Sequence, residues 1–211
     1  MNPKPLRQVD VYGPAGRLEA LYRELQDPAA VAVVCHPLTT GGGTLHNKVV
    51  FRAARGLEAA NVATLRFNFR GAGGSAGKFE GGEGEHDDFL AALTWVRKTH
   101  ADKPIIAGGF SFGSWVASRA ACEDPGIRAV FLIGTPVNKY DFGYLKSCEK
   151  PMLFLHGTND EHGDVNKLEK LAQGVRNAET VIVTGADHFF SKQLDAVDET
   201  MRTWAEEILA Q

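Results

Sequence analysis

The stretch Gly109-Phe110-Ser111-Phe112-Gly113 stands between the apolar run Ile105 to Phe110 and a helical run from Trp115 to Cys122. A Gly-x-Ser-x-Gly sequence between a strand and a helix holds its serine on a sharp, strained turn, because the flanking glycines let neighbouring backbone pack closely. We therefore expect Ser111 to be an exposed nucleophile near a helix amino terminus. The alternative is an ordinary glycine-rich turn, since the bare pattern is frequent by chance.

Other short apolar runs predict further strands. They are Val31 to Cys35, Val62 to Phe67, Ala129 to Ile133, Met152 to Leu155 and Val181 to Val183. Their apolar residues are nearly continuous, so both faces of each strand must be covered, as in a mainly parallel sheet with helices on both sides. Helical spacing of apolar residues follows Asn47, recurs from Phe89 to Val96 and returns from Leu194 to Ile208.

Two segments before the first buried strand predict an antiparallel hairpin. Gln8 to Tyr12 and Arg17 to Tyr22 flank turn-forming glycine and proline residues. The predicted fold class is thus α/β, with a doubly wound, mostly parallel sheet and an N-terminal hairpin, in a single domain over residues 1–211. Ligands of such sheets bind beyond the carboxyl ends of the strands.

Composition and charge exclude several classes of protein. Among 211 residues, 23 Lys plus Arg stand against 26 Asp plus Glu, without a basic run, so a nucleic-acid partner is not expected. No apolar stretch approaches the roughly 20 residues that span a bilayer, and residues 1–10 lack the apolar run of a signal peptide. Cys35, Cys122 and Cys148 are odd in number and widely spaced, which predicts reduced thiols, no disulfide and a cytoplasmic protein with no membrane partner.

A serine nucleophile needs a base and a carboxylate that orients the base. Asp160 follows the predicted strand Met152 to Leu155, and His188 follows Val181 to Val183, so both lie at the edge of the sheet where Ser111 lies. Asp164 is close enough in sequence to compete with Asp160 for His188. We assign no catalytic role to Asp187, which directly precedes the base.

These motifs together resemble the α/β-hydrolase superfamily and, within it, the small lidless serine esterases similar to dienelactone hydrolase. The resemblance covers nearly the whole chain. It is carried by Cys35-His36-Pro37, Gly42-Gly43-Thr44, Asn47 to Val50, Arg66 to Gly71, the Ser111 turn, His156-Gly157 with Asp160, and Gly185 to Phe190. Dienelactone hydrolase itself has a cysteine at the nucleophile position, so its substrate is not carried over to this serine-bearing chain.

The resemblance implies an oxyanion hole made of two backbone N–H groups, those of Phe112 and Leu38. Pro37 has no N–H to donate. Close relatives tend to have a second His-Pro pair where this chain has Leu38-Thr39. The expected substrate contacts are His36, Phe79, Phe112 and Phe189.

Other conspicuous residues have competing interpretations. Cys35 and His36 could form a thiol nucleophile with its base, but adjacent residues of a strand point in opposite directions, so a buried structural cysteine is favoured. His156, Asp160 and His162 do not match a zinc pattern, so no metal is expected. The segment Gly71 to Gly84 does not open directly into a helix, which favours a flexible border of the active site over a dinucleotide loop.

The predicted function is a carboxylesterase that cleaves small short-acyl esters through an acyl-enzyme on Ser111, without a cofactor. A thioesterase or small-amide hydrolase would use the same groups. A binding protein that has lost turnover is the alternative from another class, although all three positions hold competent residue types. Only the 16 residues from Thr135 to Lys150 separate the strand after the nucleophile helix from the next, which is too short for a cap domain. The sequence does not predict the oligomeric state.

Overall fold

The predicted strands lie side by side in one sheet of the computed structural model, which describes residues 6–211. The sheet has eight strands in the order β1-β2-β4-β3-β5-β6-β7-β8. Its strands are β1 (Leu6–Gly13), β2 (Gly16–Arg23), β3 (Ala30–Cys35), β4 (Val62–Phe67), β5 (Ile105–Phe110), β6 (Ile127–Ile133), β7 (Met152–Asn159) and β8 (Ala178–Asp187). β2 is antiparallel to both β1 and β4, and β3 to β8 are parallel, which confirms the predicted hairpin and the doubly wound sheet.

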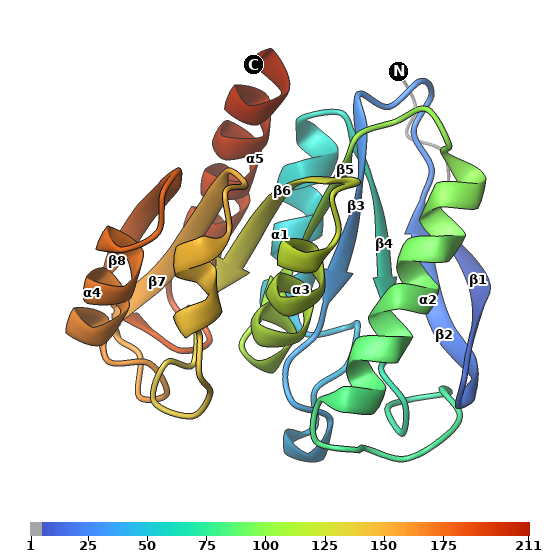
Figure 1. Ribbon diagram of the computed structural model, residues 1–211, viewed down its shortest axis with the longest axis horizontal. Helices are drawn as coiled ribbons and strands as arrows, with labels where there is room; N and C mark the ends of the chain where they lie inside the picture. The colour runs from blue at the N-terminus through green and yellow to red at the C-terminus, as the bar shows by residue number, and fades with distance from the viewer. Residues whose placement is uncertain (1–5) are drawn as a thin grey trace.

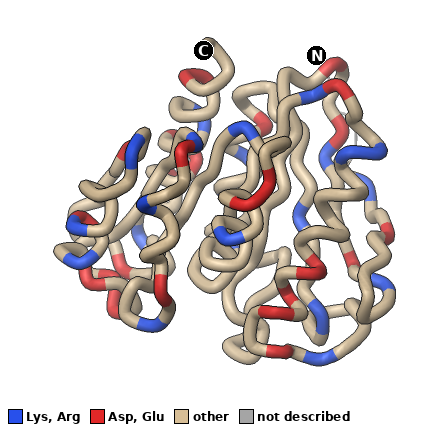
Figure 2. Tube along the Cα trace, in the orientation of Figure 1, with Lys and Arg blue, Asp and Glu red and all other residues tan. Residues whose placement is uncertain are grey.

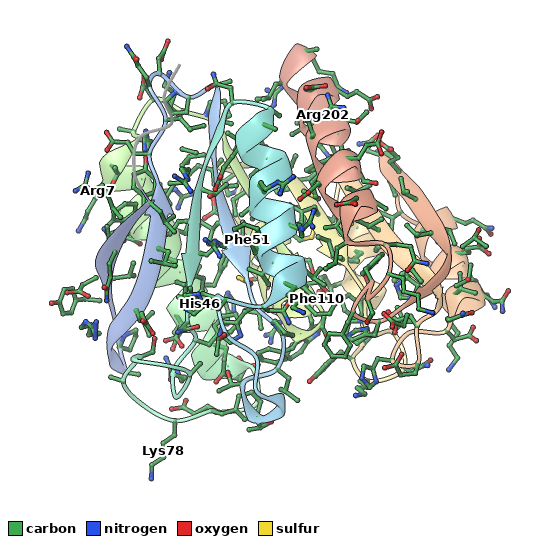
Figure 3. All side chains as sticks on the ribbon, turned by 180° about the vertical axis from the view of Figure 1, so that it is seen from behind. Arg7, His46, Phe51, Lys78, Phe110 and Arg202 are labelled. Atoms are coloured by element: carbon green, nitrogen blue, oxygen red, sulfur yellow. A yellow bond between two sulfur atoms is a disulfide. The ribbon has the colours of Figure 1, made fainter. Side chains whose placement is uncertain are left out.

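Five α-helices cover the two faces of the sheet (Figure 1). α1 (Lys48–Ala59) and α5 (Leu194–Ala210) pack on one face, which is turned toward the viewer in Figure 3. α2 (Glu83–Thr99), α3 (Phe112–Glu123) and α4 (Val165–Gln173) pack on the other face. The central strands β3, β4 and β5 are buried along their whole length, which explains their continuous apolar runs.

Two short 3-10 helices lie in connections that start from the carboxyl edge of the sheet. η1 (Thr39–Gly41) follows β3, and η2 (Gly143–Ser147) lies between β6 and β7. The connection that contains η2 holds no α-helix, in agreement with the absence of a cap domain there. α4 has no counterpart among the predicted helices, because only Leu168 and Ala172 of its residues are buried and its apolar pattern is short.

The cysteine prediction was wrong. Cys122, near the end of α3, and Cys148, directly after η2, form a disulfide with their Cα atoms 5.3 Å apart. They are 26 residues apart in sequence and meet because the η2 connection folds back onto α3. Cys35 is a free, buried thiol.

The glycine-rich segment between β4 and α2 is anchored rather than a free border. Arg70 forms a buried ion pair with Asp88 of α2 at 2.8 Å, and it reaches Glu80 at 3.0 Å. The buried carboxylate of Glu85 accepts hydrogen bonds from the backbone N–H groups of Glu80 and Gly82. These contacts fix both ends of the loop against the first turns of α2.

No helix within residues 6–211 has both the length and the apolar character needed to cross a membrane.

Candidate active site

Ser111 lies at the junction of β5 and α3, in a backbone conformation that side chains seldom adopt. Its φ is 55° and its ψ is −123°. The glycines on either side permit this turn, since a Cβ at Gly109 would lie 2.7 Å from the Cys35 carbonyl oxygen and one at Gly113 would lie 2.5 Å from that of His36. No side chain fits at either position, so the sequence pattern follows from the close approach of β3 to the turn.

A chain of hydrogen bonds joins three loops at the carboxyl edge of the sheet. His188, which follows β8, has Nε2 at 2.9 Å from Ser111 Oγ and Nδ1 at 2.8 Å from Asp160 Oδ2. A carboxylate only accepts, so Nδ1–H donates to Asp160 and Nε2 is left to accept the serine hydroxyl. The geometry thus gives Ser111 a base that is already in the correct tautomer and orientation.

The other carboxylate oxygen of Asp160 is held by the loop after β7. Oδ1 accepts hydrogen bonds from the backbone N–H groups of His162 at 2.8 Å and Gly163 at 3.0 Å. The buried His156 ring supports this loop from below, because its Nε2–H donates to the Gly163 carbonyl at 2.7 Å and lies 3.7 Å from Asp160. Asp160 therefore cannot turn away from His188 without breaking three hydrogen bonds.

The electrostatic setting keeps Asp160 ionised. Burial by itself would raise the pKa of the Asp160 carboxyl, but the hydrogen bond and charge of His188, the nearby His156 and the His162 amide lower it overall. Burial, assisted by the neighbouring His188, lowers the pKa of His162, whose ring packs edge-on against His188 with centroids 4.5 Å apart. His188 is 2% exposed and Ser111 is 9% exposed, so Ser111 is more enclosed than the predicted exposed serine.

Two backbone N–H groups, one directly after Ser111 and one in the loop after β3, have no hydrogen-bond acceptor among residues 6–211. They belong to Phe112, the first residue of α3, and to Leu38, which follows Pro37 in the loop after β3. His36 fixes this loop, because its Nδ1 is 2.6 Å from the Pro37 carbonyl oxygen and its Nε2 accepts the Phe69 N–H at 3.0 Å. Unpaired N–H groups near a nucleophile are the donors that an oxyanion requires.

A family model described as an alpha/beta hydrolase domain matches residues 30–210. The chain belongs to this family. An uncharacterized protein of Rickettsia prowazekii is 38% identical over 195 residues, which are 87% of this chain and 82% of that protein.

Two solved structures extend the comparison. An alpha-beta serine hydrolase homologue from Coxiella burnetii is 30% identical, with a TM-score of 0.88 over 93% of this chain and 96% of that one. A Xanthomonas campestris protein described as an a/b serine hydrolase without lid is 32% identical, with a TM-score of 0.88 over 98% of this chain and 96% of that one. This member of the alpha/beta hydrolase family thus shares the fold of serine hydrolases along nearly its whole length.

Two of the predicted substrate contacts have buried side chains. His36 in this alpha/beta hydrolase is fully buried, and both its ring nitrogens are engaged, so it holds the loop after β3 in place. The Phe112 ring is also buried, inside an aromatic cluster with Phe69, Phe79 and Tyr140, and only its backbone N–H is free for a ligand.

The other two predicted contacts are accessible. Phe79 is half-buried, and Phe189 is 47% exposed, with its ring 5.2 Å from that of His188. Phe189 also borders a cavity of about 450 Å³ that the sequence analysis did not identify, on the side of the site near His46 and α1. Figure 3 shows His46 and Phe110 near the same end of α1. The cavity is lined by Gly42, Thr44, His46, Asn47, Lys48, Val49, Phe189, Ser191 and Leu194.

The competing residues have other partners. Asp164 is the amino-terminal cap of α4, where its side chain accepts the Lys167 N–H at 2.9 Å. Asp187 accepts the Ser191 N–H at 2.9 Å. No group of three or more His, Cys, Asp or Glu side chains within residues 6–211 has an arrangement that could hold a metal ion.

Proposed function

We propose that this chain is a serine esterase, a carboxylic ester hydrolase that cleaves small short-acyl esters by way of an acyl-enzyme on Ser111. The observation that carries the proposal is the unbroken hydrogen-bonded path from Asp160 through His188 to a strained Ser111, and the unpaired N–H groups of Phe112 and Leu38 support it. This combination supplies nucleophile, base, orienting carboxylate and oxyanion donors from the chain itself.

In the acylation half, Ser111 Oγ attacks the ester carbonyl carbon while its proton passes to His188 Nε2. The negative charge that develops on the carbonyl oxygen is stabilised by the N–H groups of Phe112 and Leu38. Collapse of the tetrahedral intermediate breaks the bond to the leaving oxygen, which takes the proton from His188 and departs as the alcohol.

In the deacylation half, water takes the place of the alcohol. His188 removes a proton from water as the water oxygen attacks the acyl carbon, and the same proton returns to Ser111 Oγ when the acid is released. Asp160 stays ionised throughout, because its hydrogen bonds lower its pKa, and it stabilises the imidazolium that forms in each half.

Thioesters and small amides are alternative substrates for the same groups, since the steps differ only in the leaving atom. A non-catalytic binding protein is a further alternative. The strained backbone of Ser111 argues against it, because such strain is found at functional sites and has no evident use in a passive pocket.

The test is labelling with a fluorophosphonate probe, followed by turnover of matched ester, thioester and amide substrates. We expect the probe to modify Ser111 and the ester to be turned over fastest. Labelling elsewhere would exclude the proposed nucleophile. Labelling at Ser111 with no turnover of any substrate would favour the binding protein.

The role of the carboxylate is tested by Asp160→Asn, with Asp164→Asn as the matched control. Loss of the orienting charge should lower kcat by about 10⁴-fold in the first variant, as it does in other serine hydrolases of this mechanism. Asp164→Asn should leave kcat within about twofold of the wild type, since Asp164 caps α4. The reverse ranking would transfer the role to Asp164.

A further inference from the structure

A second cavity lies outside the chain of hydrogen-bonded catalytic residues, between α4 and the connection from β6 to β7. Its volume is about 290 Å³, which suits a small chemical group and not a whole drug-sized ligand. Its walls are formed by Val137, Tyr140, Asp141, Phe142, Gly143, Lys146, Lys167, Lys170 and Leu171.

Three lysines from two separate segments line this cavity. Lys146 comes from η2, and its side chain packs over Gly174 at the end of α4. Lys167 and Lys170 come from α4, and Lys167 Nζ crosses to the connection, where it donates to Asn138 Oδ1 at 3.0 Å. Figure 2 shows basic positions on both α4 and the connection that faces it.

The charge of these lysines is not balanced by the surrounding protein. None of the three forms an ion pair with a carboxylate in the part of the chain that the structure describes, whereas Lys103 and Arg97 pair with acidic residues at 2.7 Å and 2.6 Å. Asp141 is the one acidic residue that lines the cavity, and its Oδ1 accepts the Gly143 N–H at 2.7 Å. The chain as a whole carries a net charge of −3, so a local excess of positive charge at this cavity is opposite in sign to the net charge of the protein.

One aromatic ring of the cavity wall also contacts the residue that follows Ser111. Tyr140 lines the cavity and stacks on Trp115, with ring centroids 4.7 Å apart. The same Tyr140 ring is 5.8 Å from that of Phe112, the residue that follows Ser111. Tyr140 therefore connects the wall of the cavity to the residue that follows Ser111.

We propose that this cavity binds a carboxylate or phosphate group that the substrate carries away from its scissile ester. Lysine ammonium groups are compact charges suited to such anions, and the Tyr140 and Phe142 rings form an apolar part of the same lining. This inference rests on the proposed esterase function for its substrate, but the binding itself does not require turnover.

Binding is tested by titrating the protein with inorganic phosphate and recording its backbone amide chemical shifts by NMR. A titration with chloride at equal ionic strength is the reference. We expect shifts at Gly143 and Leu171 in the wild type, and in Ser111→Ala to the same extent. The triple variant Lys146→Gln, Lys167→Gln, Lys170→Gln should bind phosphate at least about fivefold more weakly, since each exposed charge contributes modestly. Lys98→Gln, on the distant α2, is the matched control and should bind as the wild type does. Equal affinities in the triple variant and this control would overturn the proposal.

The source of the anion is tested with two esters of equal chain length, 4-nitrophenyl hydrogen adipate and its neutral methyl ester. We expect the ratio of kcat/KM for the charged ester to that for the neutral ester to fall about fivefold in the triple variant, and phosphate to compete with the charged ester alone. An equal effect of phosphate on both esters would overturn the substrate-borne anion and assign the cavity to a free anion. Failure of the wild type to turn over either ester would count against the esterase proposal, while the phosphate titration would still decide the binding site.

Discussion

At the scale of single residues, Ser111 shows how the fold maintains a strained conformation. The Ser111 N–H donates to the Ile133 carbonyl at 2.9 Å. The Ser111 carbonyl accepts from the Ser114 N–H at 2.9 Å and from the Ser114 hydroxyl at 2.6 Å. These bonds hold a φ and ψ pair that costs a residue with a side chain about 1–3 kcal/mol. The strain aims Oγ at His188, so it has a use in the proposed reaction.

Glycine at this position should relieve the strain and remove the nucleophile. We expect the unfolding free energy of Ser111→Gly to be about 1 kcal/mol larger than that of Ser111→Ala, so that the glycine variant is the more stable one. The reason is that glycine adopts this conformation without a Cβ clash. Both variants should lower kcat by about 10⁴-fold or more. Urea unfolding of the pair measures the difference. A glycine variant less stable than the alanine variant would show that the turn is not strained.

His36 should make stability depend on pH. Burial lowers the pKa of its ring from 6.5 to about 4, so the unfolded chain binds a proton between these values that the folded chain does not. Stability should therefore fall as pH decreases from about 6.5 to about 4, by up to about 1.4 kcal/mol per pH unit, and this term is absent above pH 6.5.

The comparison of slopes isolates this histidine. His36→Gln should show a shallower loss of unfolding free energy between pH 6.5 and pH 4, whatever its stability at pH 7. Parallel curves for the wild type and His36→Gln, measured by urea unfolding, would contradict a lowered pKa.

At the scale of elements, the disulfide joins the nucleophile helix to the connection that walls the lysine-lined cavity. Cys122 lies in the last turn of α3, and Cys148 follows η2. A hydrogen bond reinforces the same junction, since Tyr144 Oη lies 2.8 Å from Ser118 Oγ of α3. The disulfide and this hydrogen bond thus attach the connection to α3 at two points.

Loss of the disulfide should lower stability under oxidising conditions only. Closing a loop of this length contributes roughly 3 kcal/mol through the unfolded chain, so Cys148→Ser should reduce the unfolding free energy by about that amount. A reductant should bring the wild type close to the variant while leaving the variant unchanged. Equal stability of the two proteins without reductant would show that the cysteines do not pair.

At the scale of the whole molecule, the carboxyl edge of the sheet is bordered by short connections. The connection between β6 and β7 contains only η2, and the glycine-rich segment after β4 is anchored through Arg70 and Glu85. The accessible cavity beside Phe189 has a volume of about 450 Å³. An acyl chain that outgrows such a site extends into water.

Short acyl esters should accordingly be the better substrates. Each methylene that is fully buried gains about 0.8 kcal/mol, and a methylene left in water gains little of it. We expect kcat/KM on 4-nitrophenyl esters to peak at about two to six acyl carbons, without a jump when the substrate forms an interface. A maximum at about twelve carbons or beyond, or interfacial activation, would mean that a loop closes over the site.

Local sequence signals were sufficient for much of this protein. Buried parallel strands read as continuous apolar runs, and the Gly109 and Gly113 positions are dictated by backbone approach, so both can be recognised without knowledge of distant contacts. Asn47 likewise caps α1 through its own side chain. The helix α4 was missed because its buried face holds too few residues to give a period.

The sequence by itself determined the order of the strands along the chain, the doubly wound sheet and the edge at which Ser111, Asp160 and His188 had to lie. Only the tertiary structure showed that His188 is hydrogen-bonded to Asp160 while Asp164 caps α4, that His36 and the Phe112 ring are buried, and that Cys122 pairs with Cys148. The physical reason is the distance along the sequence between the residues on which each feature depends. Strand runs and glycine turns depend on neighbours along the chain, whereas the direction of a side chain and the meeting of two cysteines depend on how segments far apart in sequence pack against one another.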